Sequence, residues 1–105
     1  MILRILQLDI EKSHGIIFCD YNRIEDQFSL SNYSIIYEDK NFEHINPLTN
    51  TPFEENINEL LDYIYIIFNC GKKPETYKGH SLSVSDIIEL NGVMYYVDGI
   101  GFVKL

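Results

Sequence analysis

The spacing of apolar residues changes along the chain, and the first part has the period of two that is typical of β-strands. In residues 2–10, apolar and polar residues alternate from Leu6 onward. The runs at 15–21 and 33–37 are short, apolar and rich in β-branched and aromatic residues, which predicts two further strands. The polar segment 22–32 is expected to join them as a loop or a short helical turn.

After a polar connector at 38–50, the apolar residues take up the period of a helix. Thr51 suits the N-cap position, Pro52 suits the first helical position, and Glu54 completes a T-x-x-E capping box. Gly71 is expected to end the helix as its C-terminal cap. The pattern predicts one amphipathic helix at 52–69, with an apolar stripe made of Phe53, Ile57, Leu60, Leu61, Ile64, Ile67 and Phe68.

The C-terminal part of the chain has the pattern of a β-hairpin. Asn91 and Gly92 separate two β-rich runs, and this pair favours a two-residue turn because both residues accept positive φ. Such a turn sets Leu90 opposite Val93, Ile88 opposite Tyr95 and Asp86 opposite Val97. One face then holds Ile88, Leu90, Val93, Tyr95 and Val97, and the other holds Ser85, Glu89, Met94, Tyr96 and Asp98, with Ile87 as an apolar exception. The run GIGFVKL adds a last strand after a glycine bend.

These elements follow the order β-β-β-α-β-β-β, which predicts an α+β domain with a single helix packed on a mainly antiparallel sheet. A chain of 105 residues, 46% of them hydrophobic, is typical of one domain, residues 1–105, with a buried core. No apolar run reaches the roughly 18 residues that cross a bilayer. The apolar start MILRILQLDI lacks the basic flank and cleavage site of a signal peptide, so a cytoplasmic location is expected.

The formal net charge of −8 is unevenly distributed along the chain. Residues 1–62 hold 12 acidic and four basic residues, whereas residues 63–105 hold four of each. This sign disfavours direct binding to nucleic acid or to an anionic membrane and favours a basic partner protein. The alternative is an ordinary acidic protein whose charge keeps it dispersed. The candidate partner-binding acids are Asp20, Glu25, Asp26, Glu38, Asp39 and Glu43, and Glu54, Glu55, Glu59 and Asp62 would extend this surface along the helix.

His80, Ser81, Ser83 and Asp86 lie close together in the sequence and raise the question of a nucleophile set. A catalytic triad is built in space, so adjacency in sequence is weak support, and the chain has no strained G-x-S-x-G turn here. We interpret the stretch as a folding device. Gly79 is expected to allow an unusual backbone angle, and the hydroxyls and Asp86 are expected to satisfy backbone N–H groups at the start of the hairpin.

The cysteine and histidine residues are not spaced as metal ligands. Cys19 and Cys70 are far apart, and neither belongs to a C-x-x-C or H-x-x-x-H pattern with the three histidines. In a reducing cytoplasm both are expected to be free thiols that are at least partly buried. The sequence indicates no metal and no other cofactor, and it shows no acid–base pair, so an enzyme is not expected.

Residues 68–105, FNCGKKPETYKGHSLSVSDIIELNGVMYYVDGIGFVKL, resemble the YodL-like domain family, and the middle third resembles it loosely. Members often carry F-N, P-x-x-Y/F-x-G-H/R-S-L-S-V-S-D, a short hairpin, Y-V-D and G-F. The matching residues are Phe68, Asn69, Pro74, Tyr77, Gly79, His80, Ser81, Leu82, Ser83, Val84, Ser85, Asp86, Tyr96, Val97, Asp98, Gly101 and Phe102. We expect a structural role for Gly79, His80, Ser81, Ser83, Asp86, Asn91, Gly92, Asp98, Gly101 and Phe102.

The resemblance implies a setting rather than an activity, since such domains occur in bacterial conjugative elements and phages, alone or beside anti-restriction proteins. Together with the charge, it favours a small acidic interaction protein that inhibits a nucleic-acid-handling defence enzyme of the bacterial host, as anti-restriction or anti-CRISPR proteins do. The alternative is an accessory or regulatory module of a conjugative element, or a binder of a host cell-structure protein, without charge mimicry.

Overall fold

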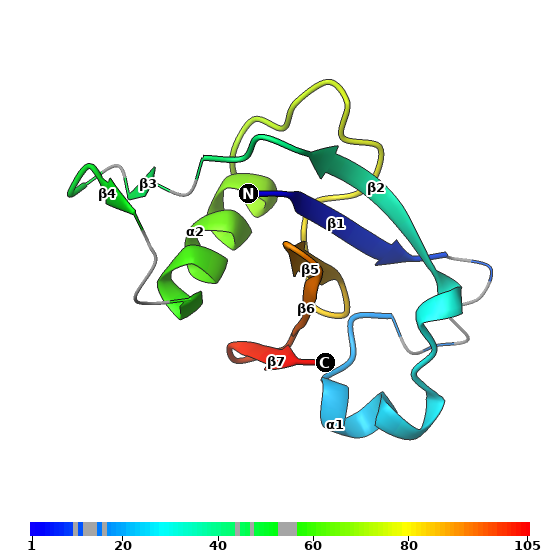
Figure 1. Cartoon of the computed structure of the whole chain (residues 1–105). Coiled ribbons are helices and arrows are strands. Elements are labelled where there is room, and N and C mark those ends of the chain that lie inside the picture. The colour runs from blue at the N-terminus through cyan, green and yellow to red at the C-terminus, as the bar shows by residue number, and fades with distance from the viewer. Residues whose placement is uncertain (10, 12–14, 16, 44, 47, 53–56) are drawn as a thin grey trace.

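The computed structural model describes residues 1–9, 11, 15, 17–43, 45–46, 48–52 and 57–105. At its centre is a five-stranded antiparallel sheet with the strand order β2-β1-β5-β6-β7 (Figure 1). Its strands are β1 (Leu3–Leu8), β2 (Tyr33–Asp39), β5 (Ile87–Leu90), β6 (Val93–Val97) and β7 (Phe102–Lys104). The other elements are the hairpin of β3 (Ile45–Asn46) and β4 (Thr51–Pro52), the helices α1 (Tyr21–Ile24) and α2 (Ile57–Asn69), and 3₁₀ turns at Glu25–Gln27 and Leu30–Asn32.

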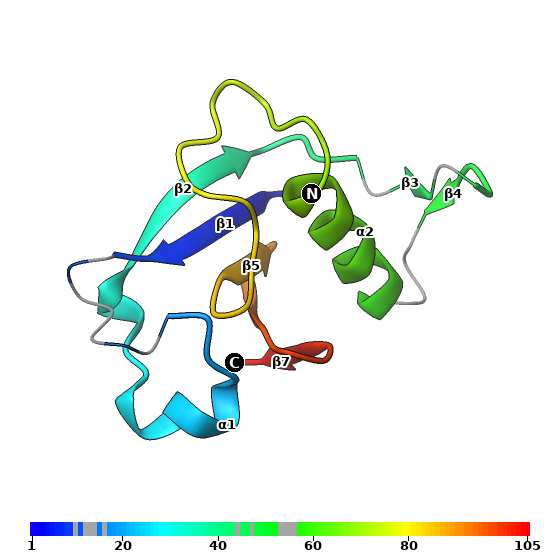
Figure 2. The same cartoon turned by 180° about the vertical axis from the view of Figure 1, so that it is seen from behind.

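The predicted α+β class and the mainly antiparallel sheet are confirmed. Both faces of the sheet are covered, because α2 packs on one face and the segment that carries α1 packs on the other (Figures 1 and 2). In β1, Leu3 and Ile5 belong to the core under α2, whereas Leu6 and Leu8 belong to the core on the α1 side. The sequence pattern indicated a half-buried strand, but β1 lies inside the sheet and is buried on both faces.

The predicted strand at 15–21 is wrong for the residues that the structure describes. Gly15, Ile17 and Phe18 lie in turns, and α1 begins at Tyr21. Phe18 has a positive φ of 64°, which is incompatible with a regular strand. The segment is held by the sheet instead of joining it, and Ile24 enters the core beside Tyr96.

The C-terminal end of α2 is confirmed at Asn69, but its predicted start is wrong. Thr51 and Pro52 form β4 and pair with Asn46 and Ile45, so Thr51 is not an N-cap and Pro52 is not the first helical residue. Phe53, Glu54 and Glu55 lie outside the described residues. Of the predicted stripe, Leu60, Leu61, Ile64 and Phe68 are buried, Ile67 is half-buried, and Ile57 is exposed.

Gly71 follows the end of α2 for a reason of space and not of backbone angle. Its φ is outside the left-handed region, so it is not the positive-φ cap that the pattern predicts. A Cβ atom at this position would lie 2.6 Å from the carbonyl oxygen of Ile67. Any side chain here would therefore press on the last turn of the helix.

The hairpin and its register are confirmed, since Leu90 faces Val93 and Ile88 faces Tyr95. Asn91 and Gly92 have φ values of 48° and 86°, as a type I′ turn requires at both central positions. Asn91 also ties the turn to the chain start, because its Oδ1 accepts a 2.7 Å hydrogen bond from the Ile2 N–H. The face that appeared polar, apart from Ile87, is the second core, where Ile87 and Tyr96 pack under the α1 segment.

Candidate functional site

The serine-rich loop, residues 79–86, is irregular and encloses the carboxylate of Asp86. Asp86 is fully buried. Its Oδ2 accepts hydrogen bonds from the Ser83 N–H at 2.8 Å and from the side-chain amide of Gln7 at 3.0 Å. The expected role of Asp86 as an acceptor for a backbone N–H at the start of the hairpin is confirmed, and the second donor comes from β1.

Gln7 links β1 to this loop. Its Oε1 accepts a 3.2 Å hydrogen bond from the His80 N–H, and its Nε2 donates a 2.8 Å hydrogen bond to the His80 carbonyl. Gly79 packs directly on the Gln7 side chain, and a Cβ atom at Gly79 would overlap Gln7 Oε1. The expectation of an unusual backbone angle at Gly79 is wrong, since its φ is not positive. Gly79 instead leaves room for the Gln7 amide, which a Cβ atom would push away from its hydrogen bonds with His80.

His80 and Asp86, which both belong to the serine-rich loop, lie close to each other. His80 Nε2 lies 3.9 Å from Asp86 Oδ1, and both atoms are buried without a hydrogen-bond partner among the described residues. The other ring nitrogen, Nδ1, lies 2.8 Å from the Ser81 carbonyl oxygen. Burial raises the pKa of Asp86 from 3.8 to about 7, although the Ser83 N–H, His80 and Gln7 each oppose this rise. At 3.9 Å the two atoms are too far apart for a direct hydrogen bond.

The geometry supports the folding interpretation of the loop over a nucleophile set. The Ser83 hydroxyl donates a 2.8 Å hydrogen bond to the Ser81 carbonyl and not to His80. Both imidazole nitrogens face the protein's own groups, one the Ser81 carbonyl and the other Asp86. A triad requires the base to face the nucleophile as well as the orienting carboxylate, and this arrangement provides only the carboxylate.

Ser85 produces a β-bulge where the loop enters β5. Its N–H donates to the Val97 carbonyl at 2.9 Å, while the Val97 N–H donates to the Asp86 carbonyl at 2.8 Å. Two residues therefore face Val97, where the hairpin pattern placed Asp86 alone. Ser85 has a φ of 85°. Its hydroxyl oxygen accepts a 3.0 Å hydrogen bond from the Phe18 N–H, and its carbonyl accepts one of 2.6 Å from the Tyr33 hydroxyl.

The F-N residues at the end of α2 hold the loop from the other side. The side-chain amide of Asn69 donates a 2.8 Å hydrogen bond to the Leu82 carbonyl, and the Leu82 N–H donates to the Phe68 carbonyl at 3.0 Å. Phe68 stacks on Tyr77 with 5.6 Å between the ring centres. The Tyr77 hydroxyl donates to the His80 carbonyl at 2.7 Å. Burial raises the pKa of the Tyr77 hydroxyl well above its usual range, so it remains a donor.

The Y-V-D residues at the end of β6 hold the α1 segment through two reciprocal hydrogen bonds. Asp98 Oδ1 accepts one of 3.0 Å from the Tyr21 N–H, and Asp20 Oδ1 accepts one of 2.9 Å from the Gly99 N–H. The Tyr96 hydroxyl adds a 2.6 Å hydrogen bond to the Cys19 carbonyl. The carboxylate of Asp98 thus has the structural role that the resemblance implied, and the N-terminal part of α1 has a fixed position on the sheet.

The remaining signature residues Gly101 and Phe102 shape the turn between β6 and β7. Gly101 has a φ of 77°, and its carbonyl accepts a 3.0 Å hydrogen bond from the Asp98 N–H. Phe102 is half-buried against the core under α2. A pocket of about 170 Å³ lies between α2 and this turn, lined by Asp62, Tyr65, Val84, Val97, Asp98, Gly99, Gly101 and Phe102. Nothing in the sequence pattern indicated this pocket, because it forms only when α2 packs beside the turn.

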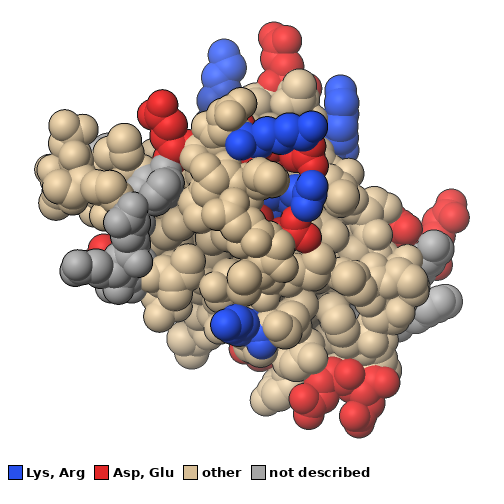
Figure 3. Space-filling model, in the orientation of Figure 1, with Lys and Arg blue, Asp and Glu red and all other residues tan. Residues whose placement is uncertain are grey.

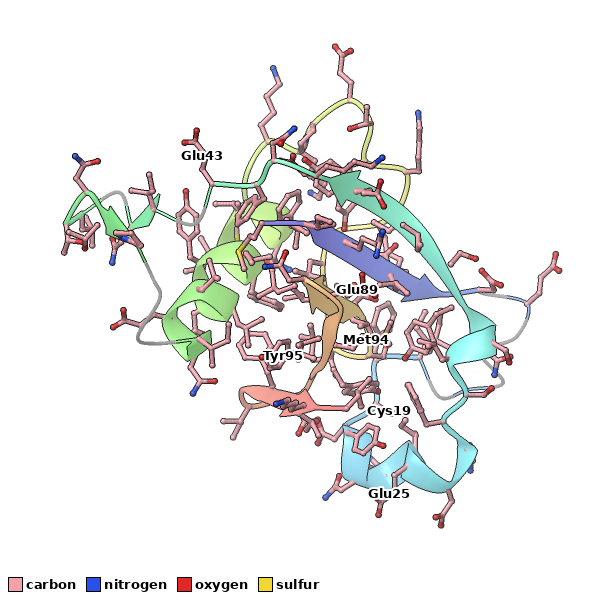
Figure 4. The ribbon with its side chains drawn as sticks, in the orientation of Figure 1. Cys19, Glu25, Glu43, Glu89, Met94 and Tyr95 are labelled. Atoms are coloured by element: carbon pink, nitrogen blue, oxygen red, sulfur yellow. The ribbon has the colours of Figure 1, made fainter. Side chains whose placement is uncertain are left out.

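The six candidate acids do not form one surface. Asp20, Glu25 and Asp26 lie on the α1 segment, which we call the acidic end, whereas Glu38, Asp39 and Glu43 lie at and beyond the end of β2. These two groups are at opposite ends of the molecule, as the positions of Glu25 and Glu43 in Figure 4 show. Acidic side chains predominate around α1, and acidic and basic side chains mix at the other end (Figure 3).

Glu38 is also neutralised by a basic neighbour. It pairs with Arg4, whose Nη1 lies 2.6 Å from Glu89 on the adjacent strand. The hydrogen bond from Arg4 lowers the pKa of Glu38. Glu89 was not among the candidate acids, and its buried position is explained by this contact with Arg4 across the β1–β5 pair. Glu38 is therefore less suited to a basic partner than the exposed Glu25 and Asp26 of the acidic end.

Both cysteines are free thiols, as expected, but only Cys19 is half-buried and Cys70 is exposed. Within the described part of the chain, no three His, Cys, Asp or Glu side chains are grouped as metal ligands. No helix in that part is sufficiently long and apolar to cross a membrane.

Similarity to a known protein family extends over nearly the whole chain. The model of the YodL-like domain matches residues 2–105. The chain belongs to the YodL-like domain family. The match extends beyond the C-terminal signature to β1, the α1 segment and β2, and the first 30 residues, which did not contribute to the resemblance in sequence, are included. No curated protein and no solved structure matches the chain.

The residues of the family signature account for the positions of both the serine-rich loop and the α1 segment. The two parts of the family signature contact different N-terminal elements of this chain, since Asp86 meets Gln7 of β1 and Asp98 meets Tyr21 of α1. In this YodL-like domain the signature therefore joins the sheet to the N-terminal residues.

Proposed function

We propose that this YodL-like protein is a non-catalytic binding module that contacts a basic surface of a partner protein through its acidic end. The observation that carries the proposal is the attachment of that end to the sheet. The reciprocal hydrogen bonds between Asp20 and Gly99 and between Asp98 and Tyr21 hold α1 in place, while Glu25 and Asp26 are exposed beside it. A backbone that is already held in place loses little entropy when a partner binds.

In its most specific form, the proposal names the partner as a nucleic-acid-handling enzyme of a bacterial host, blocked in the cytoplasm by a protein of a mobile element or phage. Such enzymes have basic grooves that bind phosphates. Duplex DNA carries one charge per about 1.7 Å of its axis, and the acids here form two separate groups. We therefore propose a local contact with the rim of a basic groove and not an imitation of a whole duplex.

The second candidate function is an accessory or regulatory binding module of a conjugative element, or a binder of a host cell-structure protein. One observation favours it. Ile100 and Leu48 are 97% and 93% exposed, and side chains of this kind suit an apolar contact better than an electrostatic one. An interface that uses them would bind independently of the acidic end.

The test uses partners captured from a bacterial lysate with the intact protein. Association with each partner is measured at low and high salt for wild type, for Glu25→Gln/Asp26→Asn, and for the matched control Glu43→Gln/Glu75→Gln. We expect the acidic-end variant to associate at least about fivefold more slowly at low salt, with the difference shrinking as salt rises, because exposed charges act mainly on the association rate. Equal, salt-independent rates in all three proteins would refute the electrostatic contact.

A cleavage assay with the captured enzyme then tests the specific form. The proposal predicts that wild-type protein and the control pair slow cleavage of DNA by that enzyme, while Glu25→Gln/Asp26→Asn slows it less. A partner that does not handle nucleic acid would favour the accessory or cell-structure function.

A further inference from the structure

We propose that the open edge of β7 and the pocket beside it form a docking groove for an extended basic segment of a partner protein. The β7 groove is defined by the outer edge of β7, the pocket between α2 and the β6–β7 turn, and the exposed residues Ile66 and Ile100. The inference rests on the proposed function that this protein binds a basic partner, and it adds a second site outside the acidic end.

Within the described residues, the outer edge of β7 presents main-chain groups that no other strand pairs with. β7 is the last strand of the sheet order, and among the described residues it pairs only with β6. The N–H of Leu105 donates to the Met94 carbonyl, and the N–H of Asp98 donates to the Gly101 carbonyl. In an antiparallel ladder, residues whose N–H and C=O groups face the partner strand alternate with residues whose groups face away from it. Phe102 and Lys104 therefore turn their N–H and C=O groups away from β6. An extended peptide can pair with those groups and add a sixth strand.

The pocket beside this edge has the size of one side chain. Its volume of about 170 Å³ is below the roughly 300–1,000 Å³ of small-molecule sites. Tyr65, Val84, Val97 and Phe102 supply apolar walls. The pocket adjoins β7 through Phe102, so a peptide paired with the strand edge would place alternate side chains toward it.

The charge of the pocket determines which side chain fits. Asp62 of α2 and Asp98, the residue after β6, both line it. Asp98 uses Oδ1 for the Tyr21 N–H, and a carboxylate has further acceptor positions. A lysine or arginine side chain can lay its methylene groups on the apolar walls and bring its cationic group to these two carboxylates. An acidic or a purely aliphatic side chain would leave them without a counter-charge.

Two exposed apolar residues flank the pocket. Ile100 lies in the turn between the lining residues Gly99 and Gly101 and is 97% exposed. Ile66 is 59% exposed and lies one helical turn after the lining residue Asp62, on the same face of α2. An extended segment seated along β7 would cover apolar surface at this rim, which adds a non-electrostatic contribution to binding.

The experiment selects random peptides of about a dozen residues, displayed on phage, for binding to the intact protein. We expect the enriched peptides to alternate β-branched or aromatic residues with others and to contain a lysine or arginine at one shared position. Synthetic peptides are then measured against four variants. Lys104→Pro removes an outward N–H without breaking the ladder to β6, and Lys104→Ala is its control. Asp62→Asn removes a pocket charge, and Asp26→Asn removes one from the acidic end.

We expect Lys104→Pro and Asp62→Asn each to weaken peptide binding at least about tenfold, while Lys104→Ala and Asp26→Asn change it less than about twofold. Amide chemical shifts of Phe102 and Lys104 should move on binding. Thermal unfolding of each variant shows whether it is folded, and Asp62→Asn tests the groove independently if Lys104→Pro unfolds. Failure to enrich any peptide, or enrichment that ignores these variants, overturns the groove. The enriched peptides could instead carry an aliphatic residue at the shared position and bind equally well to Asp62→Asn. That result would contradict the proposal that the pocket takes a lysine or arginine side chain.

The same variants separate this inference from the function on which it rests. A captured basic partner that depends on Glu25 and Asp26 but not on Asp62 or Lys104 would retain the acidic-end contact and overturn the groove. Peptides that depend on Asp62 and Lys104, in a protein whose partners ignore Glu25 and Asp26, would support the groove and refute the acidic-end contact.

Discussion

Gln7 and Asp86 are 79 positions apart in the sequence, and the side-chain amide of Gln7 donates a 3.0 Å hydrogen bond to the Asp86 carboxylate in the buried centre of the protein. The same amide group exchanges hydrogen bonds with the backbone of His80. One polar side chain of β1 therefore determines where the serine-rich loop lies on the sheet.

Removing the Asp86 carboxylate is expected to destabilise the fold. In Asp86→Ala, the Ser83 N–H and the Gln7 amide would both lose a buried acceptor. We expect a loss of about 1–3 kcal/mol in the free energy of unfolding, measured by urea denaturation. Binding should fall only in proportion to the unfolded fraction. An Asp86→Ala protein that is as stable as wild type yet inactive would show that the loop is a reactive site and not a folding device.

Asp86→Asn should behave differently from Asp86→Ala. The asparagine carbonyl can accept the same two hydrogen bonds, and its amide carries no charge, so it avoids the desolvation that penalises the buried carboxylate. At pH 8 we therefore expect Asp86→Asn to be at least as stable as wild type. A stability close to that of Asp86→Ala would mean that the charge of the carboxylate, and not its shape, is required.

The stability of wild type should fall as pH rises through neutrality because of Asp86. Its pKa is raised by burial from 3.8 to about 7, so the folded state holds a proton that the unfolded state releases. The stabilising contribution is complete below pH 3.8 and is lost as pH passes about 7. The measurement is the difference in unfolding free energy between wild type and Asp86→Asn from pH 5 to 8. A difference that does not change with pH would exclude this titration.

Leu61 is fully buried under the sheet, so Leu61→Ala should destabilise the protein by about 2–5 kcal/mol. The matched control on the same helix is Ile66→Ala, because Ile66 is 59% exposed. We expect the control to lose less than about 1 kcal/mol. Thermal and urea unfolding measure the stability of both variants. Equal losses of stability would mean that α2 does not pack on the sheet through the face that carries Leu61.

The hairpin turn requires glycine at position 92, where φ is 86°. Gly92→Val should cost on the order of 1 kcal/mol or more, because a β-branched residue resists positive φ. A Cβ atom here has open space around it, so the cost would come from backbone strain alone. Gly92→Asn is the control, since asparagine tolerates this conformation better. An unchanged melting temperature of Gly92→Val would contradict the turn type.

The sequence by itself determined the elements whose conformation depends on residues close to one another in the chain. The Asn91–Gly92 turn, its register and the end of α2 at Asn69 follow from the φ preferences of these residues and from the helical spacing of the apolar stripe. The family signature was also recognisable in the sequence, because its short motifs follow one another within residues 68–102.

Only the tertiary structure decided the rest, because those features depend on contacts between distant segments. The run at 15–21 has the composition of a strand, but the Phe18 and Tyr21 N–H groups bond the side chains of Ser85 and Asp98 instead of a neighbouring strand. Competition of this kind cannot be read from local propensity. The acids of residues 1–62 are near one another in sequence, yet β2 carries half of the candidates to the far end of the molecule. Amino-acid composition determines the total charge, whereas the course of the sheet determines which charges lie together on the surface.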